Sequence, residues 1–163
     1  MKVLRSAALV ALLAVWSAAS ASGGDQFKIT APSGWVKIDQ VSGTILAMWG
    51  EPHPAGFRQS ISITDESFAG TLPQYVAAMK GYQKSTTPDI QFGPAADVVT
   101  CIDHPAMFLS WKSAAGGHKL VMEQVLSVWY GRGYTLTYAR EQGEAASDDA
   151  RSALASLCVR QHK

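Results

Sequence analysis

The clearest alternation of apolar and polar positions runs through residues 118–140 and predicts two long antiparallel strands joined at residues 131–133. The hairpin has two plausible registers. A two-residue loop at Gly131-Arg132 would mix Ser127 and Glu123 into the aromatic face. A three-residue loop gives a continuous apolar face and puts Gly133 in the left-handed position that such loops need, so we expect this register.

In the expected register, the two faces of the hairpin differ in character. The apolar face is made by the pairs Tyr130 with Tyr134, Val128 with Leu136 and Leu126 with Tyr138, continuing through Met122 and Leu120. The opposite face carries Trp129, Val125 and Val121 among polar side chains. One buried face and one wetter face predict an antiparallel sheet that helices cover on one side.

Shorter alternating segments predict further strands, over residues 27–31, 35–38, 44–49, 57–64, 98–102 and 106–111. Two segments have helical spacing. The first begins at Thr71, with Gln74 placed to complete a capping box. The second is capped at Ser147 and continues to the basic end of the chain, with Cys158 on its apolar face. We therefore expect an α+β fold with a curved antiparallel sheet of about six to eight strands. Both main helices are expected to pack on one face of that sheet.

The first 21 residues have the pattern of a secretory signal peptide. A basic start is followed by an apolar run from Ala7 to Trp16 and by an Ala19-Ser20-Ala21 cleavage motif. Removing these residues from the 163-residue chain leaves 142, so we expect one domain over residues 22–163 with no transmembrane segment. We expect the mature protein to be secreted, in the bacterial periplasm.

Charge excludes some partners. Lys2 and Arg5 leave with the leader, so 12 of the 14 basic residues remain against 13 acidic ones. A nearly neutral chain lacks the basic surface typical of nucleic-acid binding, and it also lacks a polybasic membrane patch.

The chain has two cysteines, Cys101 and Cys158, and both remain after cleavage of the leader. In an oxidising compartment such a pair is most simply a structural disulfide. A redox-active pair would normally be close in sequence, and a metal site would need more than two thiol ligands.

No catalytic constellation is evident. The four histidines are scattered, and a metal site built from His104 and Asp103 with His53 or Glu51 would depend on contacts across the fold. No serine lies in a nucleophile motif, and the adjacent carboxylates suit a turn and a helix start rather than facing catalytic groups. We expect no catalytic residues, no metal and no cofactor.

The aromatic residues suggest a surface for recognition. We propose from the pattern that Trp129, with Val125 and Val121 beside it on the wetter hairpin face, contacts a partner. The proline-rich loop at residues 51–56, which contains His53, is a second candidate. The alternative is that other parts of the fold cover Trp129.

The order of elements resembles the Mog1/PsbP-like fold, which includes DcrB-like and LpqN-like bacterial envelope proteins. The resemblance covers nearly all of the mature chain and rests on residues 32–35, 60–63, 72–75, 134–138 and 153–157. It implies a protein without enzymatic activity that binds partners. We therefore expect an accessory or binding protein of the periplasm whose partner is another envelope or secreted protein. A small secreted hydrolase and a metal or small-ligand carrier remain the alternatives.

Overall fold

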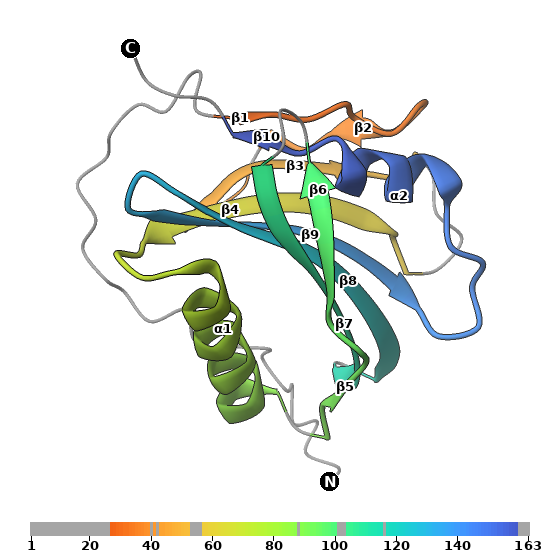
Figure 1. Ribbon diagram of the computed structural model, residues 1–163. Coiled ribbons are helices and arrows are strands. Elements are labelled where there is room, and N and C mark those ends of the chain that lie inside the picture. Colours follow the sequence, from red (N-terminus) through yellow and green to blue (C-terminus); the bar gives the residue numbers. More distant parts are fainter. Residues whose placement is uncertain are drawn as a thin grey trace, which may run out of the picture.

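A computed structural model describes residues 27–39, 41, 43–52, 57–87, 89–100, 104–115 and 117–159. Figure 1 shows a curved, open sheet with two helices. The strands are β1 (Phe27–Lys28), β2 (Val36–Lys37), β3 (Ile45–Gly50), β4 (Ser60–Ser67), β5 (Gln91–Phe92), β6 (Ala96–Thr100), β7 (His104–Ala115), β8 (His118–Trp129), β9 (Arg132–Glu141) and β10 (Cys158–Val159). The helices are α1 (Leu72–Thr86) and α2 (Asp148–Ala155).

The main sheet contains eight antiparallel strands within the described residues. Its order is β2-β3-β4-β9-β8-β7, and both β5 and β6 pair with the outer side of β7. Strands β1 and β10 form a separate antiparallel pair. The predicted α+β class and antiparallel sheet are confirmed.

The register of the β8–β9 hairpin differs from both registers considered above. Trp129 pairs with Arg132 and Val125 pairs with Leu136, around a two-residue turn at Tyr130-Gly131. Both turn residues have positive φ, 45° at Tyr130 and 75° at Gly131, as a type I′ hairpin turn requires. Our expectation was wrong because it assumed one buried face, whereas both faces of the hairpin are buried.

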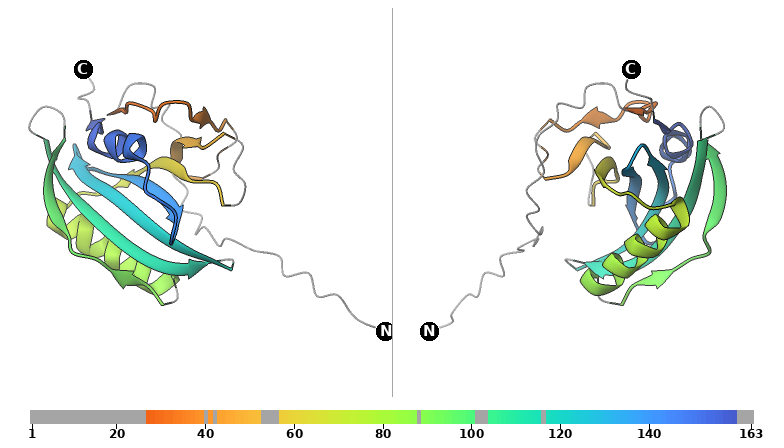
Figure 2. Two further views of the ribbon diagram at one scale, coloured as in Figure 1. Left: turned by 90° about the vertical axis from the view of Figure 1, so that its right-hand side faces the viewer. Right: turned by 60° about the vertical axis from the view of Figure 1, so that its left-hand side comes forward.

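The two helices cover opposite faces of the sheet, as Figure 2 shows, so the predicted packing on one face is wrong. Leu126 of β8 packs in a cluster with Tyr75 and Val76 of α1. Val125, its neighbour, packs in the other cluster with Ala150 and Leu154 of α2. Because successive side chains of a strand point to opposite faces, these contacts place the helices on opposite sides.

Both helices begin where the sequence predicts. The side chain of Thr71 accepts a hydrogen bond from the Gln74 backbone N–H, and Gln74 completes the capping box. Ser147 caps α2, with two aspartates in the first turn, where the helix dipole favours anions. However, α2 ends at Ala155, and Cys158 lies in β10 rather than on the helix. The backbone N–H of Ser156 bonds to the last turn, and the chain then extends to pair with β1.

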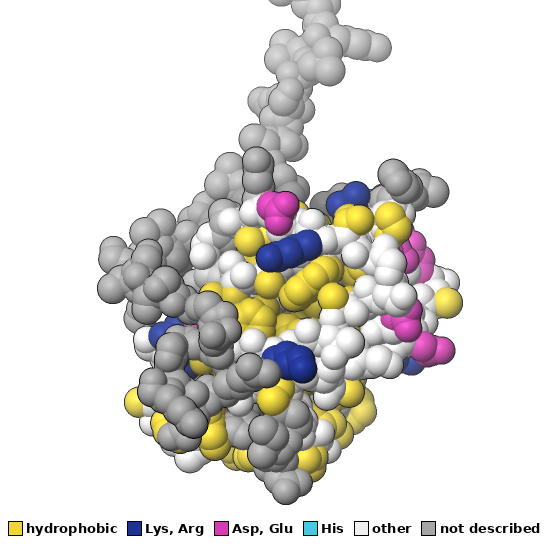
Figure 3. All heavy atoms as spheres, turned by 90° about the horizontal axis from the view of Figure 1, so that it is seen from above, with side chains coloured by type: hydrophobic (Ala, Val, Ile, Leu, Met, Phe, Trp, Pro, Cys, Tyr) yellow, Lys and Arg dark blue, Asp and Glu magenta, His cyan; other side chains and the backbone are white. Residues whose placement is uncertain are grey.

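The core consists of two clusters, one on each side of the sheet. The larger lies under α2 and contains the fully buried Ile61, Ile63, Leu136 and Tyr138. The smaller lies under α1 around Leu109 and Leu126. At the end of the molecule where β1 and β2 lie, seen from above in Figure 3, hydrophobic side chains reach the surface in a shallow hollow with basic side chains beside it. Among the described residues, neither helix is long and apolar enough to cross a bilayer.

Candidate functional site

A groove of about 470 Å³ lies between α2 and β6, with β7 and β8 as its floor. Figure 1 shows β6 and α2 at the same end of the sheet. Most of the lining side chains are apolar. The described lining residues are Val98, Val99, Thr100, Phe108, Glu123, Val125, Arg151, Leu154 and Ala155.

The position of α2 defines one wall of the groove. Ala150, Ala153 and Leu154 are buried against the sheet. Arg151 and Ala155 lie four residues apart, on one side of the helix, and both line the groove. The pattern that buries one helix face therefore also presents one cation and one small side chain to the groove.

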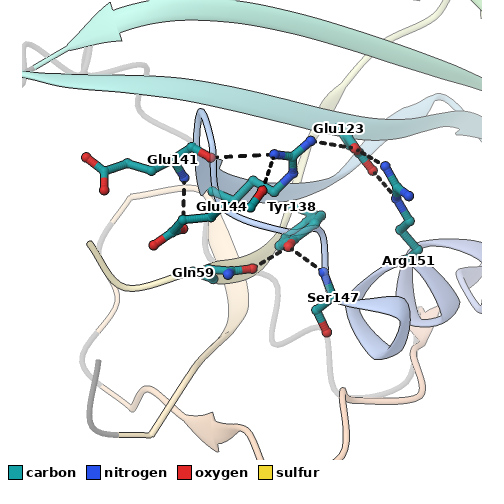
Figure 4. A network of polar contacts seen from close by, with 8 residues as sticks. Gln59, Glu123, Tyr138, Glu141, Glu144, Ser147 and Arg151 are labelled. Carbon is teal, nitrogen blue, oxygen red and sulfur yellow. Dashed lines mark hydrogen bonds and ion pairs between the residues drawn. The ribbon is translucent and has the colours of Figure 1, made fainter. Parts of the chain in front are cut away.

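Glu123 is the buried charge of the site, with 5% of its surface exposed. Arg151 donates from Nη2 to Oε1 at 2.8 Å and from Nε to Oε2 at 3.1 Å, as Figure 4 shows. Arg140 approaches the same carboxylate, with Nη2 3.6 Å from Oε1. Hydrogen bonds and the charge of Glu123 raise the pKa of Arg151. A carboxylate held in this way is compensated by its partners and poorly placed to act as a base.

Tyr138 fixes the start of α2 relative to the sheet. Its hydroxyl donates a hydrogen bond to the side-chain oxygen of Gln59 and accepts one from the Ser147 backbone N–H at 3.0 Å (Figure 4). Burial raises the pKa of Tyr138. One hydroxyl thus joins the residue before β4, strand β9 and the cap of α2, so the groove wall is held by buried polar contacts.

The structure does not bring the predicted recognition residues together on one exposed surface. Val125 and Val121 are only 3% and 8% exposed, and Val125 lies at the floor of the groove. Trp129 is half-buried, packs against the core under α2 and has its ring 4.8 Å from that of Tyr130. His53 lies outside the described residues. The expected exposed strip of Trp129 and two valines is therefore wrong, because both valines are buried, and Val125 packs in the cluster under α2.

The other predicted chemistry is largely untested. Asp103 and Cys101 lie outside the described residues, as does the predicted leader, so the disulfide and the cleavage point remain predictions, and the alternative metal site built on Asp103 is not tested. Among the residues that the structure describes, no three His, Cys, Asp or Glu side chains lie close enough to hold a metal ion.

Sequence reasoning missed Glu123, Arg140 and Arg151 as a group. One signal was present, because a charged residue in the middle of an apolar strand needs a partner when it is buried. The sequence did not show which residue is the partner of Glu123, because Arg151 lies 28 residues further on, in a helix that we expected over the opposite face of the sheet.

No family model matches this sequence, and no curated protein sequence matches it. Solved structures do match it. LpqN of Mycobacterium tuberculosis, described as involved in cell envelope biogenesis, is 14% identical with a TM-score of 0.55, over 80% of this chain and 82% of LpqN. The cyanobacterial PsbP protein of Synechocystis sp. PCC 6803 is 13% identical with a TM-score of 0.54, over 86% of this chain and 91% of that one.

A protein of unknown function from Pseudomonas aeruginosa, PA94, described as a putative regulator, is 14% identical with a TM-score of 0.54, over 67% of this chain and 84% of that one. At these identities the likeness concerns the fold. The predicted resemblance is confirmed, and the protein has the Mog1/PsbP-like fold.

Proposed function

We propose that this protein is an extracytoplasmic binding protein without catalytic activity, and that the groove between α2 and β6 is its recognition site. The observation that carries the proposal is the pairing of Glu123 with Arg151. Because both carboxylate oxygens are engaged, the groove offers a partner apolar shape rather than a reactive group. The described lining contains no histidine, cysteine or serine that could serve as nucleophile or base.

The proposed location rests on the leader pattern of residues 1–21 and on the similarity in fold to LpqN, which is described as involved in cell envelope biogenesis. We also propose the disulfide between Cys101 and Cys158. Thr100, the residue before Cys101, lines the groove together with Ala155, three residues before Cys158. In addition, no free cysteine occurs among the described residues. The partner we propose is another envelope or secreted protein.

Site-specific photo-crosslinking in exporting cells tests this function. A lysine analogue that carries a diazirine at the end of its flexible side chain, and so does not fill the groove, replaces Ala155, an exposed residue of the groove wall; in a control chain it replaces Tyr82, which is 52% exposed on α1. We expect a discrete adduct from position 155 that position 82 does not give. The same adducts from both positions, or none from position 155, would show that the groove is not the recognition site.

A further inference from the structure

Among the described strands, β6 lies at an edge of the sheet and pairs with β7 alone. It pairs with β7 from Ala96 opposite Phe108 to Thr100 opposite His104. Within the described residues no strand pairs with its other side. Along such an edge, alternate residues direct their backbone N–H and C=O groups outward, where another strand can bind them.

This edge lacks the usual protection. Natural edge strands are commonly protected by lysine, proline or a bulge. The β6 sequence is Ala-Asp-Val-Val-Thr, with Asp97 as its only charge. Val99 is 71% exposed, more than any other large hydrophobic side chain that the structure describes. An exposed apolar edge of this kind is typical of an interaction site.

The groove adjoins this edge. Three consecutive residues, Val98 to Thr100, line it. Since successive side chains point to opposite faces, a groove that touches all three also reaches the backbone of β6. A strand laid along β6 would therefore have backbone partners on one side and an apolar slot, between Phe108 and Leu154, for its alternate side chains.

The charges at the site select among possible occupants. Inside the slot, Glu123 and Arg151 neutralise each other, which favours apolar side chains. Asp97 is exposed on the other face of β6 and favours a cation opposite it. A second copy of this chain would bring its own Asp97 and no lysine or arginine on its β6.

We propose that β6 binds an extended segment of a partner polypeptide by strand addition. The segment has apolar side chains at alternate positions, directed into the slot, and a lysine or arginine on its other face near Asp97. This inference deepens the proposed function, since it rests on the groove being the recognition site.

The test begins with the exported protein and a phage library of nine-residue peptides. We expect enriched peptides to alternate apolar residues and to carry a basic residue. A synthetic peptide of the enriched sequence is then added to ¹⁵N-labelled protein. We expect the outward-facing backbone amides among residues 96–99, which are alternate residues, to become protected from hydrogen exchange, while those of α1 do not change. No enrichment, or binding without protection of β6, would overturn strand addition.

Matched variants locate the binding. Val99→Lys places a charge on the exposed edge, and Ala155→Trp fills the slot from the surface. Each variant should lower the affinity for the peptide by about tenfold or more. The controls are Val36→Lys, on β2 at the far edge, and Ser152→Trp, which is exposed on α2 but does not line the groove. Equal losses from variants and controls would overturn the proposal. So would a wild-type dimer that Val99→Lys converts to a monomer, because the edge would then serve self-association.

The two proposals fail separately. An adduct of position 155 with a lipid or another molecule that is not a polypeptide would leave the groove as a recognition site and overturn strand addition. Absence of any adduct, together with failure of the library, would remove both.

Discussion

Glu123 shows how one buried side chain depends on its neighbours. Its carboxylate lies between Arg140, whose side chain is largely buried, and Arg151, whose side chain is mostly exposed. Buried ion pairs add little stability when intact, but removing one member leaves an uncompensated charge. The two arginines should therefore contribute differently to the free energy of unfolding, although both pair with Glu123.

We expect Glu123→Gln to lower the free energy of unfolding by about 3 kcal/mol, because two guanidinium groups then face each other without a carboxylate. Arg151→Met should cost only about 1 kcal/mol, since Arg140 still pairs with Glu123 and the lost partner is solvent-exposed. Urea denaturation measures both. If both substitutions lowered the free energy of unfolding equally, burial of the charge would not be what determines the loss.

Gly133 is required by a neighbouring ring rather than by its backbone conformation. A Cβ at this position would overlap the ring of Tyr75. We expect Gly133→Ala to destabilise the protein by about 1–3 kcal/mol through overpacking. In the background of Tyr75→Leu the same change should cost much less free energy of unfolding, as a double-mutant cycle would show.

Gly81→Ala, on the open surface of α1, should instead stabilise the protein by about 0.5–1 kcal/mol.

Three buried tyrosines predict a loss of stability at high pH. Burial raises the pKa of Tyr75, Tyr134 and Tyr138 above the ordinary value of 10.0. Above pH 10 the unfolded chain releases these protons while the folded chain keeps them, so unfolding becomes more favourable as pH rises. Urea midpoints should be steady from pH 8 to 9 and fall beyond pH 10. The urea midpoint of the Tyr75→Phe variant should fall less steeply with pH than that of the wild type. An identical fall would exclude Tyr75 as a cause.

At the scale of elements, local signals predicted the starts of both helices and the presence of strands at β6 and β7, because caps and alternation depend on nearby residues. The hairpin register, and the face of the sheet that each helix covers, could not be predicted from such local signals. Val125 and Leu126 are adjacent and both buried, so the apolar pattern of β8 fits either face. Tyr130 also adopts a positive φ that its residue type does not suggest.

Tyr138 connects three elements, and its hydroxyl should matter most at the start of α2. We expect Tyr138→Phe to destabilise the protein by about 1–2 kcal/mol, because Gln59 and the Ser147 N–H lose a buried partner. Amide exchange of residues 147–151 should rise more than that of α1. Tyr130→Phe, at an exposed turn, is the control, and uniform exchange changes in both variants would contradict this local role.

At the scale of the whole molecule, burial of both sheet faces leaves edges and loops for recognition. The overall fold could be predicted from element order, and its class is confirmed. The groove between α2 and β6 could not be predicted, because it depends on which face each helix covers and on contacts between residues as distant as Glu123 and Arg151.

The two cysteines give a prediction for the exported chain. Its mass should correspond to a start after Ala21, and thiol reagents should label no cysteine before reduction and two after it. The cross-link closes a loop of about 57 residues, so replacing both cysteines by serine should cost up to about 4 kcal/mol. Labelling of two thiols without reductant would refute the proposed disulfide.

The pairing of β1 with β10 has a consequence for engineering. Phe27 lies opposite Val159, so the two ends of the described chain are about 5 Å apart. A short glycine-serine linker could close them into a ring. A circular permutant with new termini between β7 and β8 would then retain the helices and the sheet order, and its free ends would lie at the opposite side of the sheet from β1 and β10.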